Sequence, residues 1–402
     1  MLETFPTEAP YRINQVMASP LLMGFLFAVQ LALAAAATVV IRRRSQFGWW
    51  LAICSLIGLT ALFFSLASWG TSDIAKLNFY FDPVRETGPP LQALLPFEPF
   101  WWSLAPLIIQ LPYRMAAVQG LIVAGFAAVP VLLSRSWNLQ VWAGWWLLLL
   151  CTSPILRGFF QNSHSRQAFA TLLAVPLFLW GIGVLRGKAL WVMGSAMFSI
   201  GVHLTALPTL VLAGLPALRL VQWQRLARRK SFWLLVSVLV LILVVLLSPL
   251  LTKLNAYGGG GFFSSYPIKT DVLRAQFLLV GTVAVVCLKQ RHSWRKFLDE
   301  QEGCCLLLYL GCYVTIQASL FLRFFPQISF RLGDTVGIFL LLSFLAWLRR
   351  RQALFMVLPL LVFSLLAWGD RVVWPEGLNC GSDDDFLCIP DRWPWSIHYV
   401  IR

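Results

Sequence analysis

Arg157, His164 and Arg166 lie close together between two long apolar runs of the chain. Asn162 or Ser163 can cap the helix that starts there, so that its first N–H groups and its positive dipole end face the same place. An arginine adds a fixed cation whose planar donor fork suits phosphate oxygens. We therefore expect an anion site that includes Arg166. The alternative is a solvated loop whose basic side chains reach lipid headgroups.

Two other groups of polar residues fall within apolar segments, where polar side chains are costly and usually face a cavity. His203 lies in SIGVHLTALPTLV, at a predicted break of the chain, and its alternative role is that of a hydrogen-bonded structural histidine. Arg323 and Arg331 flank Pro326 and are predicted to bind phosphate from one cavity if this short segment folds back. The alternative for these arginines is structural pairing with Asp334.

Asp73 and Asp82 lie in the predicted external loop 69–114. An acid just outside a helix can act as a general base or accept a hydrogen bond from a sugar hydroxyl. The alternative for each is a solvated loop acid.

The composition of the chain predicts the helices that must position these residues. The chain has 402 residues, of which 59% are hydrophobic and 12% charged, and its mean hydropathy is +0.74. Its apolar residues come in long runs, which predicts an all-α polytopic membrane protein with about 10–12 transmembrane helices. The candidate spans are 20–41, 47–68, 115–133, 139–157, 167–185, 232–251, 273–288, 303–321, 333–348 and 353–368.

Two regions do not fit a simple span. Residues 96–112 are rich in proline, which predicts a re-entrant or interfacial element. Residues 189–220 are too long for one pass and carry Gly201, His203 and Pro208 near the middle. We expect a hairpin of two half-helices that returns to the side it left.

With this hairpin folded back, the basic breaks of the chain fall on one face, among them Arg42–Arg44 and Arg349–Arg351. That face is cytoplasmic by the positive-inside rule, so both termini are predicted to be external. Topology and anionic lipids account for the formal charge of +15, and nucleic acid is not expected as a partner.

The predicted domain plan has an external segment 1–19, a transmembrane domain 20–368 with an external glycine-rich loop 252–272, and an external tail 369–402. The first segment lacks a basic stretch before an apolar one, so we expect no signal peptide. Cys380 and Cys388 flank GSDDDFL in the tail, where a short disulfide loop or two free thiols are both open. No metal-binding motif and no cofactor motif is present in the sequence.

The stretch SHSRQAFATLLAVPLFLWGIGVLRGKALWVMGSAMFSIGVHLTALPTL resembles the central part of the EpsG-like family. The shared features are an S-x-R-Q-x-x-A helix start, a short basic turn, and an apolar helix that ends in His before a small residue and Pro. PQISFRLGD resembles the second arginine region of that family, and SDIAKLNFYFD resembles its first outer loop. The family is grouped with the Wzy-type polymerases of bacterial surface polysaccharides.

The resemblance implies a multi-pass inner-membrane glycosyltransferase with a GT-C-like bundle. It would join polyprenyl-pyrophosphate-linked oligosaccharide repeats on the outer face, alongside a chain-length regulator and a flippase. Arg166, Gln167 and His203 match the central motif, and Arg331 matches the later one. Arginines would neutralise the departing pyrophosphate without a metal, and His203 or Asp73 would accept the proton of the attacking hydroxyl.

This chain departs from the family in the extra Arg323, in the acidic cysteine-flanked tail, and in the loose match of the loop acids, which puts Asp73 in question. Two other functions stay open. One is a GT-C-type transferase of single sugars from a polyprenyl phosphate, which would depend on Asp73. The other is a transporter of a lipid-linked glycan. This function predicts an internal repeat, and we find none in the sequence.

Overall fold

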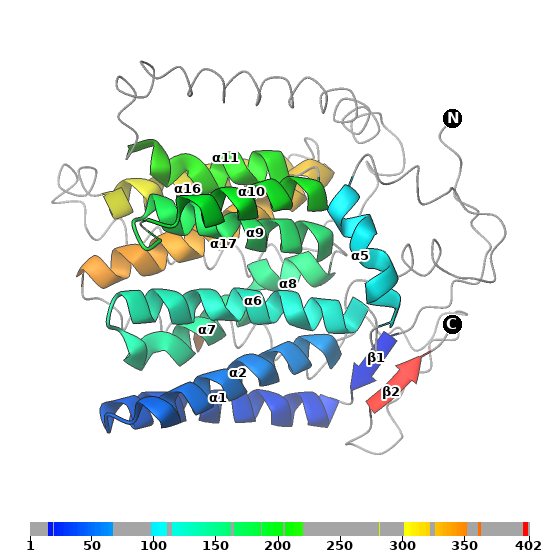
Figure 1. The fold of residues 1–402 in the computed structure, drawn as a ribbon, viewed down its shortest axis with the longest axis vertical. Coiled ribbons are helices and arrows are strands. Elements are labelled where there is room, and N and C mark those ends of the chain that lie inside the picture. Colours follow the sequence, from blue (N-terminus) through cyan, green and yellow to red (C-terminus); the bar gives the residue numbers. More distant parts are fainter. Residues whose placement is uncertain are drawn as a thin grey trace. The chain divides into compact units, whose positions relative to one another are not determined.

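The computed structural model describes residues 15–18, 20–66, 98–110, 115–161, 165–185, 187–203, 206–219, 281, 301–321, 326–351, 361–362 and 397–400. In this part of the chain the elements are helices, apart from one short strand pair (Figure 1). The chain divides into two compact units, Met1–Arg166 with Val357–Arg402, and Gln167–Met356. We call them unit 1 and unit 2.

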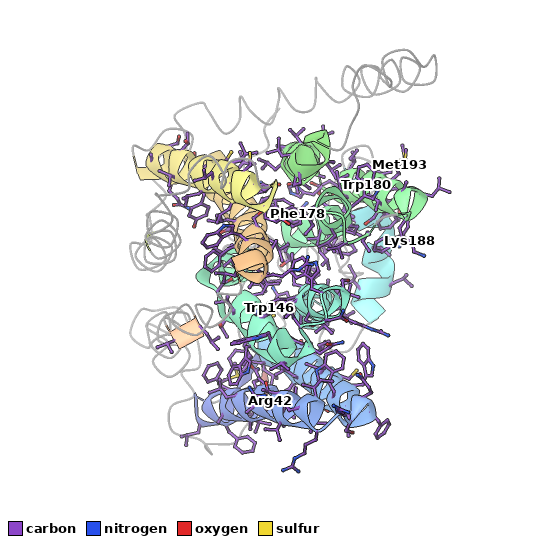
Figure 2. All side chains as sticks on the ribbon, turned by 90° about the vertical axis from the view of Figure 1, so that its left-hand side faces the viewer. Arg42, Trp146, Phe178, Trp180, Lys188 and Met193 are labelled. Carbon is purple, nitrogen blue, oxygen red and sulfur yellow. The ribbon has the colours of Figure 1, made fainter. Side chains whose placement is uncertain are left out.

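Unit 1 is built on long apolar helices that lie side by side in Figure 1. Helix α1 packs on α2, α2 packs on α6, and both α1 and α6 pack on α7. Their bounds are α1 (Pro20–Arg42), α2 (Gln46–Leu66), α6 (Met115–Ser136) and α7 (Ala143–Thr152). The centre of this packing is apolar and includes Trp146, which is fully buried (Figure 2).

The predicted span 139–157 is not one helix. It consists of a 3-10 turn (Gln140–Trp142), α7, and α8 (Pro154–Gln161). Ser153 is extended, with φ −61° and ψ 140°, because the residue before a proline is disfavoured in the helical region. The Ser153 hydroxyl donates to Leu150 O (2.7 Å) and accepts the N–H of Leu156 (3.2 Å), so it ends one helix and caps the next.

Two smaller elements complete unit 1. Helix α5 (Pro99–Gln110) has 12 residues, fewer than the roughly 20 that a membrane span needs. Strands β1 (Gln15–Ala18) and β2 (Ile397–Val400) pair antiparallel, with Gln15 opposite Val400. The sequence patterns did not predict this pair, and it joins segments near the two ends of the chain.

Unit 2 contains α9 (Ser165–Gly181, from Gln167 on), α10 (Ala189–Val202), α11 (Ala206–Gly214), the 3-10 turn η2 (Leu215–Arg219), α16 (Gln301–Phe321) and α17 (Pro326–Arg351). Helix α17 packs on α16 and α11. Phe178, Tyr309 and Phe339 join α9, α16 and α17, with ring centroids 5.5–5.9 Å apart. Figure 2 shows Lys188 and Met193 on the outer side of these helices.

Four described helices are long and apolar enough to cross a membrane, namely Leu21–Arg42, Gln46–Leu66, Ala117–Ser136 and Arg331–Arg349. They agree with the predicted all-α membrane protein. Residues 189–220 contain the short helices α10 and α11 with a break at His203, and the predicted re-entrant hairpin stays a prediction. The total number of spans and their orientation also stay predictions. Span 232–251, the loop 252–272 and most of spans 273–288 and 353–368 lie outside the described residues.

Candidate functional site

Arg166 forms an ion pair with Glu98 in unit 1. Arg166 lies in the first turn of α9, and its Nη1 donates to Glu98 Oε2. Glu98 directly precedes Pro99, the first residue of α5, where a negative charge favours the positive end of the helix dipole. The Glu98 side chain is 3% exposed and that of Arg166 is 16% exposed. The guanidinium is therefore held in a largely desolvated place, where charge-assisted hydrogen bonds are strong.

A second contact anchors the start of α9. Gln119 Nε2, on α6, donates to Ser165 Oγ over 3.3 Å, and both side chains are buried. Ser165 is the first residue of α9, so this bond and the ion pair fix the first turn of the helix from two sides. A fixed guanidinium at a helix N-terminus can bind an oxyanion with little reorganisation.

Sequence analysis predicted Arg166 and missed Glu98. The signal that could have found it is an acid just before a proline at the start of a predicted helix, in PFEPFWW. No short-range pattern connects the two residues, because the ion pair spans 68 positions of the chain.

Gln167 is buried in unit 2 and cross-links two helices. Its Nε2 donates to the backbone oxygen of Arg331 (2.7 Å) and to Thr335 Oγ1 (2.9 Å) on α17. Thr171, one turn further along α9, lies 3.4 Å from the same Thr335 oxygen. The structure thus brings together two predicted site residues, Gln167 and Arg331, and it gives the amide of Gln167 a structural task.

Asp334 is buried on α17 in the same layer of unit 2. Tyr313, on the adjacent helix α16, is buried as well. Gln317 follows Tyr313 by one turn, and its Nε2 lies 3.0 Å from the point where a Cβ on Gly333 would stand. Tyr313 and Gln317 were not predicted; the available signal is a pair of polar side chains one turn apart in an apolar run.

His203 lies at the predicted break, after the last residue of α10, and its side chain is buried. The backbone N–H of His203 donates to Ser199 O (3.3 Å), and its backbone oxygen accepts the N–H of Ala206 (2.9 Å). Ser199 Oγ donates in turn to Ala170 O on α9 (2.7 Å). The break that carries His203 is therefore attached to the helix that carries Gln167.

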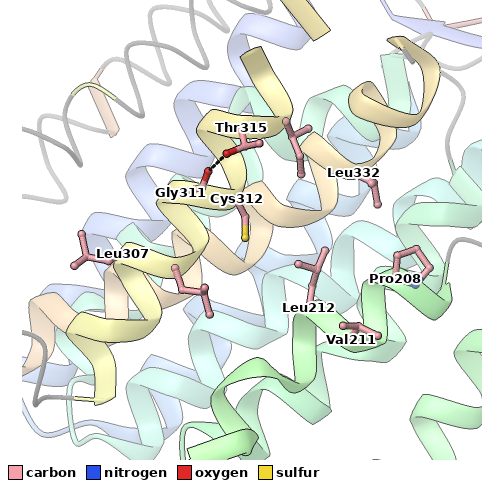
Figure 3. A pocket seen from close by; sticks show the side chains of 10 residues that line it. Pro208, Val211, Leu212, Leu307, Gly311, Cys312, Thr315 and Leu332 are labelled. Atoms are coloured by element: carbon pink, nitrogen blue, oxygen red, sulfur yellow. Dashed lines mark hydrogen bonds between the residues drawn. The ribbon is translucent and has the colours of Figure 1, made fainter. Parts of the chain in front are cut away.

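An apolar pocket of about 760 Å³ lies between α11, α16 and α17 (Figure 3). Pro208 and Leu212 line it from α11, Leu307 and Cys312 from α16, and Leu332 from α17. Thr315 is at its wall, but its hydroxyl donates to Gly311 O (2.9 Å), so the polar group is already satisfied. A pocket of this kind suits an aliphatic chain and offers little to a sugar or a phosphate.

The remaining predicted residues receive no test from this structure. Arg157 lies in α8, but its side chain is not described. Outside the described residues lie Asp73, Asp82, His164, Arg323, Cys380 and Cys388. Among the residues that are described, no three His, Cys, Asp or Glu side chains are grouped as a metal site.

Comparisons with protein families, with curated protein sequences and with solved structures found no match to this chain. The resemblance to the EpsG-like family therefore depends on the sequence motifs alone. The roles that this resemblance gives to Arg166, Gln167, His203 and Arg331 stay predictions.

Proposed function

We propose that this protein is a membrane glycosyltransferase that polymerises polyprenyl-pyrophosphate-linked oligosaccharide repeats on the outer face of the inner membrane. The observation that carries the proposal is Arg166, which matches the S-x-R-Q motif and is held by Glu98 at the start of α9. A guanidinium with fixed orientation can stabilise the charge that develops on a departing pyrophosphate.

In the proposed reaction, a hydroxyl of one repeat attacks the anomeric carbon of the growing glycan. The bond between that carbon and the pyrophosphate oxygen breaks, and the charge of the leaving group is stabilised by Arg166. The proton of the hydroxyl passes to a base, for which His203 is the first candidate and Asp73 the second. The apolar pocket of unit 2 supports a substrate with a long aliphatic part, as a polyprenyl chain has.

The test is a gel of lipid-linked and surface glycan from cells that carry wild-type protein, Arg166→Ala, Arg166→Lys or no protein. We expect Arg166→Ala to lower the polymer ladder about 100-fold relative to the amount of protein in the membrane, and to leave single repeats on the outer face. Arg166→Lys should retain little activity, because Lys lacks the donor fork. Arg135→Ala is the matched control, since Arg135 lies over the Trp50 ring, 5.3 Å from its centroid.

Other outcomes would replace the proposal. Single repeats that accumulate on the inner face would identify a transporter. A loss of one sugar from each repeat, reproduced by Asp73→Asn and not by Arg166→Ala, would identify a transferase of single sugars. A normal ladder in Arg166→Ala would remove Arg166 from the chemistry.

A further inference from the structure

The turn between α1 and α2 (Figure 1) carries three consecutive arginines that the proposed reaction does not use. Arg42, Arg43 and Arg44 are all exposed, and we call them the arginine turn. In the part of unit 1 that the structure describes, the one acidic residue is Glu98, which pairs with Arg166. Like charges this close repel one another, so the arginine turn favours an anion as its neighbour.

Glu98 and its arginine partner are at the other end of unit 1. Ser165, the residue before that partner, accepts a hydrogen bond from Gln119 near the start of α6. Arg135, in the last turn of α6, instead lies over the ring of Trp50, close after the arginine turn. Gln119 and Arg135 are about 24 Å apart along the helix axis, at a rise of about 1.5 Å per residue. Glu98 is therefore too far away to balance the charge of the arginine turn.

The backbone of the arginine turn is tightly defined, and Arg44 has a conformation that few side chains adopt. Its φ is 60°, in the left-handed region that favours glycine and asparagine. The Arg44 N–H donates to Ile41 O (2.9 Å). The Ser45 N–H donates to Val40 O (3.2 Å). A Cβ on Gly48 would stand 2.6 Å from Val40 Cγ1, so the start of α2 lies directly against the end of α1.

The turn after α6 has the same hydrogen-bond pattern and a different residue at the left-handed position. That residue is Asn138, with φ 56°, and its N–H donates to Arg135 O (3.2 Å). The Leu139 N–H donates to Ser134 O (2.7 Å). Asparagine is enriched in this conformation and arginine is not. The turn itself does not require Arg44, so the strain at this position points to a task for its side chain.

Exposed apolar side chains follow the arginine turn on α2. Phe47 is 82% exposed, and Leu51, one turn further along the helix, is 60% exposed. Trp49, between them, is buried and holds this end of α2 in place, because its Nε1 donates to Gln140 O (3.2 Å). The start of α2 therefore has exposed positive charge and exposed apolar surface within a few residues of each other.

We propose that the arginine turn, with Phe47 and Leu51, is a binding site for one anionic phospholipid of the bilayer. The guanidinium groups bind the phosphate, for which their donor fork is suited, and the acyl chains lie along Phe47 and Leu51. Because α2 is a candidate span, its first turn lies at the depth of the lipid headgroups. A soluble phosphate would leave the apolar side chains unused, and a zwitterionic lipid would not balance the charge.

The experiment titrates the purified full chain in detergent with phosphatidylglycerol or phosphatidylcholine and measures bound lipid by native mass spectrometry. We expect phosphatidylglycerol to bind more tightly. The double variant Arg43→Gln with Arg44→Gln should weaken its binding about 30-fold, since each basic residue near an anionic lipid strengthens binding about fivefold. Phosphatidylglycerol with a photoreactive acyl chain should label the peptide that contains Phe47.

The single variant Arg44→Gly separates binding from folding. Glycine adopts the left-handed φ without strain, so the Tm of this variant in detergent without lipid should equal or exceed that of the wild-type protein. Its affinity for phosphatidylglycerol should nevertheless fall about fivefold. An unchanged affinity in this variant overturns the proposal.

Lys289→Gln with Arg291→Gln is the matched control, because it removes two positive charges from another predicted basic break of the chain, 289–296. It should keep the wild-type affinity. Equal binding of the two lipids, or equal losses in the two double variants, overturns the proposal, since total charge alone would then account for binding. Displacement of phosphatidylglycerol by millimolar inorganic phosphate would identify a site for a soluble anion and overturn it too. None of these results depends on polymerisation.

Discussion

In the ion pair between Arg166 and Glu98, local sequence patterns can predict one partner and not the other. The place of Arg166 at a helix start could be predicted from local signals, namely capping residues and an apolar run. Its acidic partner could not, because the contact spans 68 positions. The fold gives Gln167 a role that its motif did not predict, because its amide donates to Arg331 O and to Thr335 Oγ1. Its part in substrate binding stays a prediction.

The first prediction concerns the coupling between Arg166 and Glu98. Removal of one partner takes its opposite charge away from a largely buried ion, so Glu98→Ala and Arg166→Ala should each lower the free energy of unfolding by about 3 kcal/mol. The double variant should lose less than the sum of the two, with a coupling of about 1–3 kcal/mol in a double-mutant cycle. Denaturant unfolding of the purified protein measures these values.

The same cycle run with Glu98→Ala and Arg135→Ala provides the comparison, since Arg135 lies over the Trp50 ring. These two changes should be additive. Additivity in the pair Glu98→Ala and Arg166→Ala would show that the ion pair does not orient the guanidinium.

At the scale of the elements, apolar runs predicted several helix bounds to within a few residues. The span 20–41 is α1 (Pro20–Arg42), and the span 303–321 is α16 (Gln301–Phe321). The break at Ser153 was not predicted, because mean hydropathy is insensitive to a single proline in an apolar run. Asp334 was predicted as a site residue, whereas Tyr313 and Gln317 were not, because local patterns do not reveal which faces of α16 and α17 pack against each other.

The second prediction tests the close approach of α1 and α7. A Cβ on Gly144 would meet Ala34 Cα at 2.9 Å, so the two backbones are in contact and neither can yield easily. Gly144→Ala should therefore lower the free energy of unfolding by about 1–3 kcal/mol. Thermal or denaturant unfolding in detergent measures the change.

Gly24→Ala on α1 is the same substitution at a place where a Cβ would have no neighbour within 4 Å. It should be neutral or should stabilise the helix by up to about 1 kcal/mol, because Ala favours a helix more than Gly does. Equal effects of the two variants would contradict a close contact at Gly144.

At the scale of the whole molecule, one contact bears on topology. Arg135, in the last turn of α6, lies over the ring of Trp50 in α2, close after the basic turn that ends α1. The basic ends of α1 and α6 are therefore at the same end of unit 1, as the charge pattern predicted for Arg42–Arg44 and Arg135. The positive-inside rule predicts that this end faces the cytoplasm.

The third prediction tests that side by labelling single cysteines in intact and permeabilised cells with a maleimide that does not cross membranes. Ser45→Cys and Ser136→Cys place a thiol at the exposed turns that follow the basic residues, and both should be labelled only after permeabilisation. Gly259→Cys, in the predicted external loop 252–272, should be labelled in intact cells. Wild-type protein measures the background from its own cysteines.

Labelling of Ser45→Cys and Ser136→Cys from opposite sides would refute a shared end, and labelling of both in intact cells would invert the predicted orientation. Inversion would place the excess of basic residues outside, where the membrane potential and anionic lipids no longer account for it.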